Sequence, residues 1–166
     1  PVPLKLWSVV GDAGVVAAAN IWADESTVHG TVSPQEIPGL SGDAFVVYEH
    51  FSGAVWKLGH DEEIPVTLAP NVSALYTFLP AGDGVTPIGL VNKYISAAAM
   101  ADWLATEDRT IVVLLDGGRF AWAADSPPSE VRVNGEIAQP EHGAGIYTVD
   151  CSDLRGTVWI EITTPS

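Results

Sequence analysis

The chain has 166 residues, 47% of them apolar, which suffices for a folded hydrophobic core and excludes a disordered chain. It carries 21 acidic and 7 basic residues, a net charge of −14 that would repel a nucleic-acid backbone or an anionic membrane surface. We therefore expect neither as a partner. No apolar run reaches the roughly eighteen residues of a membrane helix.

Strand signals dominate the first half of the chain. A hairpin is predicted over 4–22, because the turn sequence GDAG separates two apolar strands. Residues 26–43 are polar and rich in turn residues, which indicates an extended loop with one short strand. A second hairpin is predicted over 44–58, and two further strands, over 64–70 and 73–80, are bounded by prolines, which cannot donate to a central ladder.

The second half continues the pattern after one ambiguous segment. Residues 93–105, KYISAAAMADWLA, are the helical candidate, with one or two turns expected at most. The dipeptide Asn134-Gly135 between alternating residues is the strongest short hairpin signal in the chain. Further strands are predicted within 109–115, 119–124, 129–139, 144–150 and 157–163.

The number and spacing of these strands predict an all-β fold, an antiparallel β-sandwich of Greek-key type with at most one short helix. The sequence contains no repeat and no low-complexity linker, so we expect a single domain over 1–166. The first ten residues lack the basic start and cleavage site of a signal peptide. We expect the natural N-terminus to be absent from this chain, so the compartment is unknown. These residues begin almost inside the first predicted strand, and we expect the chain to be a piece of a longer protein.

Metal and cofactor chemistry has no pattern to support it. The four histidines form neither a helical pair nor a His-x-His strand motif, and the acidic turn GHDEE over 59–63 lacks the spacing of an EF-hand. We therefore predict no metal site and no cofactor. Cys151 has no basic neighbour to activate it and is expected to be an inert, buried thiol.

Catalytic motifs are equally absent from the sequence. It contains no Gly-x-Ser-x-Gly elbow, and its two Gly-Asp turns do not lead from a strand into a helix, as a phosphate loop must. A glycosidase needs two convergent carboxylates, and no pair stands out among the many acidic turn residues. We predict no catalytic residue in this chain.

The six tryptophans are the most distinctive feature of the composition. An aromatic face can stack on a sugar ring, which makes Trp56 and Trp122 candidate carbohydrate contacts. The alternative is that strand-borne tryptophans fill the sandwich core. The full set is Trp7, Trp22, Trp56, Trp103, Trp122 and Trp159.

Four segments, in order, resemble the C-terminal region of the raffinose synthase and seed imbibition protein group, relatives of the family 36 α-galactosidases. They are LKLWSVVGDAGVVAAANIW, FVVYEHFSGAVWKL, IPVTLAPNVSALYTFLP and TPIGLVNKY, and they lie within residues 4–100. The family pattern PIGL is matched by Pro87, Ile88, Gly89 and Leu90. Two departures stand out: the family's NsGGA is ISAAA here, and Leu75 replaces an expected glutamate.

The resemblance implies a parent enzyme that hydrolyses or transfers α-galactosides on an upstream (β/α)₈ barrel, where such folds keep their catalytic residues. This chain would then be a non-catalytic sandwich domain that braces the barrel. Trp7 and the segment Pro87–Leu90 are the candidate packing residues. If excision leaves that surface bare, the isolated chain could self-associate through it.

Two other functions are compatible with the sequence. One is an autonomous carbohydrate-binding module, which requires at least one exposed tryptophan and would bind sugar weakly. The other is a small independent hydrolase, which requires two carboxyl groups facing one another across a cleft at about 5 to 10 Å.

Overall fold

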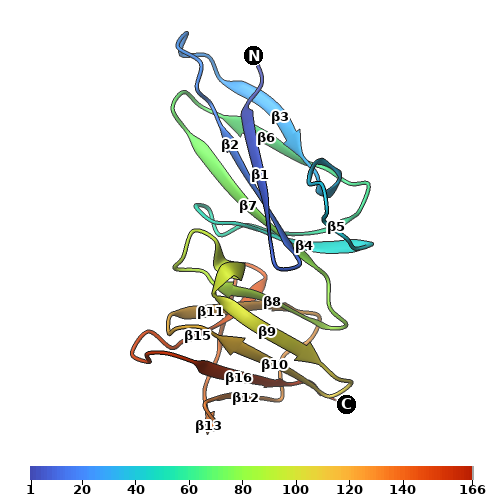
Figure 1. Ribbon diagram of the computed structural model, residues 1–166, viewed down its shortest axis with the longest axis vertical. Coiled ribbons are helices and arrows are strands. Elements are labelled where there is room, and N and C mark those ends of the chain that lie inside the picture. Colours follow the sequence, from blue (N-terminus) through green and yellow to red (C-terminus); the bar gives the residue numbers. More distant parts are fainter. Residues whose placement is uncertain (166) are drawn as a thin grey trace. The chain divides into compact units, whose positions relative to one another are not determined.

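The computed structural model describes residues 1–165, which divide into two compact units, one over Pro1–Pro80 and one that begins at Ala81 (Figure 1). Each unit is built from antiparallel sheets around its own hydrophobic core, so the predicted all-β sandwich architecture is confirmed. The described residues contain no α-helix and two short 3₁₀ turns. That the whole chain acts as a single domain stays a prediction.

The first unit packs a five-stranded sheet against a two-stranded one. The large sheet has the order β1-β2-β7-β4-β5, and β3 pairs with β6 in the small sheet. The strands are β1 (Leu4–Val10), β2 (Ala13–Ala19), β3 (Val28–Val32), β4 (Ala44–Glu49), β5 (Val55–Gly59), β6 (Ile64–Leu68) and β7 (Ser73–Pro80).

Alternation in the sequence decides which residues fill the core of the first unit. In β6, Ile64, Val66 and Leu68 are buried and the two residues between them are exposed, as period-two patterning requires. Phe45 and Phe78 from the large sheet complete this core. The predicted loop over 26–43 contains the expected short strand, β3, and the 3₁₀ turn η1 (Pro34–Glu36).

The second unit is a two-layer sandwich. One sheet has the order β13-β12-β16-β10-β9 and the other β14-β15-β11-β8 (Figure 1). The strands are β8 (Val85–Leu90), β9 (Met100–Ala105), β10 (Arg109–Leu114), β11 (Arg119–Ala124), β12 (Glu130–Val133), β13 (Glu136–Ile137), β14 (Glu141–Gly143), β15 (Ile146–Asp150) and β16 (Val158–Thr163).

The predicted Asn134-Gly135 hairpin is confirmed between β12 and β13. Val133 pairs with Glu136 across the turn, and Asn134 and Gly135 have φ angles of 49° and 85°. Positive φ at both central residues is the geometry that favours Asn-Gly in two-residue hairpins.

The ambiguous segment 93–105 forms little helix. It contains the four-residue 3₁₀ turn η2 (Ser96–Ala99), and from Met100 the chain continues as strand β9. The alanines therefore make one short turn, within the one or two that the sequence predicted. Pairing of β9 with β10 fixes the rest as strand, because tertiary pairing overrides the high intrinsic helix propensity of its Ala, Leu and Met residues.

Candidate functional site

The segment Pro87–Leu90 lies in β8, where every residue is buried. Gly89 has a φ of 108°, and a Cβ atom at this position would lie well inside van der Waals contact with the carbonyl oxygen of Ser96. Only glycine therefore allows η2 to lie directly on β8. The segment has a packing role within the second unit, and its role in packing against another domain stays a prediction.

Strand β1 is the terminal strand of its sheet and exposes apolar side chains along its length. Leu6 is 64% exposed and Trp7 53% exposed. The single basic residue of the strand, Lys5, is engaged by the Thr31 carbonyl at 3.0 Å and by the Glu36 carboxylate. Edge strands are usually protected by charge or by a covering element, and β1 has little of either. The predicted role of Trp7 in packing against another domain stays a prediction.

Of the two tryptophans predicted as sugar contacts, Trp122 lies in a hydrophobic core and Trp56 packs against one. Trp122 is fully buried and stacks on Phe120 and Tyr147, with centroid separations of 5.6 Å in both pairs. Trp56 is half-buried against the core of the first unit, with its ring 6.0 Å from that of Tyr76. The position of Trp122 gives no support to a sugar contact, because neither face of its ring is open. A contact at Trp56 stays a prediction.

Three other tryptophans are exposed, namely Trp7, Trp22 and Trp159, at 53%, 47% and 54%. The sequence contained the signal that singles out Trp159. In β16 the residues Val158, Ile160 and Ile162 are fully buried, so alternation directs Trp159 to the opposite face.

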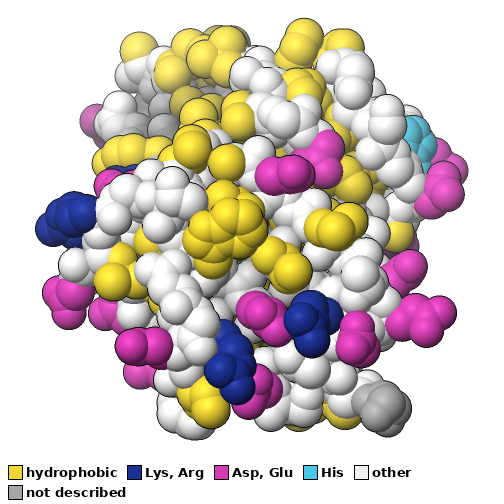
Figure 2. All heavy atoms as spheres, turned by 60° about the horizontal axis from the view of Figure 1, so that its bottom comes forward, with side chains coloured by type: hydrophobic (Ala, Val, Ile, Leu, Met, Phe, Trp, Pro, Cys, Tyr) yellow, Lys and Arg dark blue, Asp and Glu magenta, His cyan; other side chains and the backbone are white. Residues whose placement is uncertain are grey.

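Trp159 lies on the outer face of the central strand of its sheet, and charged side chains follow it along that face. Arg109 pairs with Glu161 at 3.2 Å, and Arg132 pairs with Glu130 at 2.6 Å. These five residues together with Asn134 are called the Trp159 face below. The lower end of the second unit, turned forward in Figure 2, shows apolar side chains with acidic and basic ones beside them.

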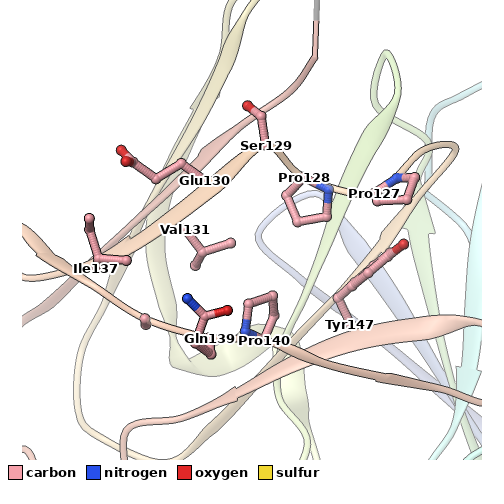
Figure 3. Close-up of a pocket in the computed structure, with 10 residues that line it drawn as sticks. Pro127, Pro128, Ser129, Glu130, Val131, Ile137, Gln139, Pro140 and Tyr147 are labelled. Atoms are coloured by element: carbon pink, nitrogen blue, oxygen red, sulfur yellow. The ribbon is translucent and has the colours of Figure 1, made fainter.

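A pocket of about 320 Å³ opens in the second unit beside β12 and β15 (Figure 3). Its size is at the lower end of the range for ligand sites. Pro127, Pro128 and Pro140 supply much of its wall, and the Tyr147 hydroxyl points toward Pro127. Glu130 is the charged side chain of its lining and is already paired with Arg132, so the pocket presents no acid–base pair.

The buried carboxylate of the described chain, Glu49, is held by backbone donors. Its two oxygens accept hydrogen bonds from the N–H groups of Leu75 at 2.9 Å, Ser52 at 2.7 Å and Phe51 at 3.2 Å. Burial raises the pKa of Glu49, but the hydrogen bonds from Ser52, Leu75 and Phe51 outweigh burial and lower the pKa below its ordinary value of 4.5. The group stabilises the β4–β5 turn on β7 and is ionised at neutral pH.

Cys151 is buried, and burial together with the nearby Asp150 carboxylate raises the pKa of its thiol to about 11. A thiol of this kind is protonated at neutral pH and is a poor nucleophile or metal ligand. Within residues 1–165, no three or more His, Cys, Asp or Glu side chains gather in an arrangement that could hold a metal ion. Over the same residues, no helix has the length and apolar character to cross a membrane.

Comparison with known proteins identifies the family. A sequence model described as raffinose synthase or seed imbibition protein Sip1 matches residues 14–151, which is most of the chain. The chain belongs to this family. The matched residues run from β2 to the end of β15 and therefore include the β8 segment and most of both units.

Similar curated proteins of the raffinose synthase family come from two plants. The chain is 28% identical to a galactinol–sucrose galactosyltransferase of Oryza sativa subsp. japonica, over 89% of the chain and 23% of the relative. It is 24% identical to probable galactinol–sucrose galactosyltransferase 5 of Arabidopsis thaliana, over 82% of the chain and 21% of the relative. The chain thus spans about a quarter of the length of these relatives.

Proposed function

We propose that this chain is the non-catalytic C-terminal β-sandwich region of a larger raffinose-synthase-type enzyme that acts on α-galactosides. In this proposal the enzyme resembles the family 36 α-galactosidases, and the sandwich region braces an upstream catalytic barrel. The observation that carries the proposal is coverage: the chain aligns over most of its own length but only 21 to 26% of the galactosyltransferase relatives. This coverage supports the proposal that the chain is one part of a larger protein.

The chemistry of the described residues supports a structural role. Glycoside cleavage by a carboxylate pair needs one acid with a raised pKa facing a second carboxylate. Glu49, the buried carboxylate, instead has a lowered pKa and three backbone donors. Its environment is that of a structural anion.

The contact with the proposed barrel is assigned to β1. The expected packing segment Pro87–Leu90 is itself buried, whereas β1 leaves Leu4, Leu6 and Trp7 exposed along an edge. When another domain covers such a surface, the burial stabilises the assembly by about 25 cal/mol per Å² of apolar area removed from water. In the isolated chain the same surface is available for self-association.

A matched pair of leucines tests this assignment. Leu6 in β1 and Leu104 in β9 are 64% and 65% exposed, and both belong to terminal strands of their sheets. In a polypeptide that includes the upstream barrel, Leu6→Ser should lower the melting temperature while Leu104→Ser leaves it unchanged. In the chain 1–166 alone, neither substitution should change the free energy of unfolding by more than about 0.5 kcal/mol. Equal effects of the two substitutions in the long polypeptide would refute the β1 contact.

The non-catalytic status is tested by activity. The purified chain is incubated with galactinol and sucrose, and separately with an aryl α-galactoside, at high protein concentration. We expect no transfer product and no released aryl alcohol above the uncatalysed rate. Turnover that co-purifies with the folded chain would overturn the proposal and favour the independent hydrolase.

A further inference from the structure

The indole of Trp159 is presented on a rigid part of the fold. β16 is the central strand of its sheet, and its alternate residues Val158, Ile160 and Ile162 anchor it in the core. The backbone of Trp159 exchanges two hydrogen bonds with Asn134: the Asn134 side-chain oxygen accepts from the Trp159 N–H at 2.8 Å, and the Asn134 N–H donates to the Trp159 carbonyl at 2.8 Å. The exposed ring is therefore held on an ordered strand.

The charges of the Trp159 face form a balanced network next to this ring. Glu161 lies two residues along β16 from Trp159, and its register partner on β12 is Arg132. Arg109 and Glu130 complete the network through their ion pairs with Glu161 and Arg132. Two carboxylates and two guanidinium groups give a net charge of zero with many donors and acceptors.

The balance of charge on this face indicates which class of ligand it can bind. The two guanidinium groups are already paired with carboxylates, so a phosphate or other anion gains little net attraction. A cation is attracted by the carboxylates and repelled equally by the guanidinium groups. An apolar protein segment would bury the four charges, at a desolvation cost that apolar contact does not offset. A neutral ligand with one apolar face and several hydroxyl groups satisfies both the indole and the network.

We propose that the Trp159 face binds a neutral carbohydrate, with a sugar ring stacked on the indole of Trp159 and its hydroxyl groups hydrogen-bonded to Glu161 and Arg132. The site goes beyond the bracing role and does not depend on it. Because the face is open and each bonding group is partly exposed, the expected dissociation constant is on the order of millimolar.

The test is a titration of the chain 1–166 with raffinose, followed by tryptophan fluorescence and by calorimetry. We expect a saturable signal, and Trp159→Ala should weaken binding at least tenfold, as removal of a central aromatic anchor does. The matched control is Trp22→Ala, which removes a tryptophan of similar exposure from the other unit and should leave the affinity unchanged.

A second variant tests the hydrogen-bonding network in a chain whose fold is checked independently. Glu161→Gln keeps the size of the side chain and removes one charge, and it should weaken binding several-fold while circular dichroism remains that of the parent chain. Absence of a saturable response up to about 100 mM raffinose, far above the expected range, overturns the proposal. So does equal weakening by Trp159→Ala and Trp22→Ala. A Trp159→Ala chain that changes from dimer to monomer in sedimentation also overturns it, because the face would then be an interface between copies.

Discussion

Replacement of Glu49 by glutamine gives a sharp test of how the first unit is stabilised. The carboxylate accepts three backbone hydrogen bonds through two oxygens, and only 5% of the residue is exposed. Glutamine has one acceptor oxygen and one NH₂ group at the same positions. At least one backbone N–H of Leu75 or Ser52 must then face another donor.

The magnitude follows from the hydrogen bonds lost. A hydrogen bond to a charged group contributes about 1.5–3 kcal/mol, and a buried donor left unsatisfied costs a similar amount. Since glutamine retains one acceptor, we expect Glu49→Gln to lower the free energy of unfolding of the first unit by about 2 kcal/mol at pH 7. Urea unfolding followed by circular dichroism measures this difference.

The effect should depend on pH with a definite sign. The folded-state pKa of Glu49 is lowered, so its contribution to stability is complete above the ordinary pKa of 4.5 and is lost as the pH falls through the lower folded pKa. The difference between the parent chain and Glu49→Gln should therefore shrink as the pH falls below 4.5, because a protonated glutamate resembles glutamine. Glu63→Gln, at an exposed turn position, is the control and should have no effect. A difference that stays constant down to pH 3, or an effect equal to that of Glu63→Gln, would refute the reasoning.

Three further outcomes are expected. Gly89→Ala should destabilise the second unit by about 3 kcal/mol or more in urea unfolding, because its Cβ would meet the Ser96 backbone at a positive φ, whereas Gly143→Ala, with open space around it, should be nearly neutral. Cys151 should react with a thiol reagent at pH 8 only after denaturant is added, since its pKa is about 11, and rapid reaction of the folded chain would contradict its burial. Trp122→Ala should cost about 3–5 kcal/mol and remove the most blue-shifted component of the fluorescence, and a loss below 1 kcal/mol would contradict the observed packing.

The tryptophans show how far the sequence alone predicts the exposure of a side chain. Trp122 sits in a strand of small and apolar residues, RFAWAA, where period-two alternation does not distinguish the inner face from the outer. TVWIEIT, by contrast, alternates strictly, and the exposure of Trp159 could have been inferred from its neighbours. The ion pairs around Trp159 could not, because Arg109 and Glu130 are far from it in sequence and meet only through strand register.

Local sequence determined the all-β class, the Asn134-Gly135 hairpin and the family, because turn chemistry, alternation and ordered motifs are written in short segments. Tertiary structure decided what those segments contact. Position 89 must be glycine because the Ser96 backbone lies where a Cβ atom would be. The lowered pKa of Glu49 depends in part on a hydrogen bond from Leu75, a residue 26 positions away in the sequence. Such contacts arise from strand order and from packing between layers. They are stabilised by residues far apart in the chain, so no short segment predicts them.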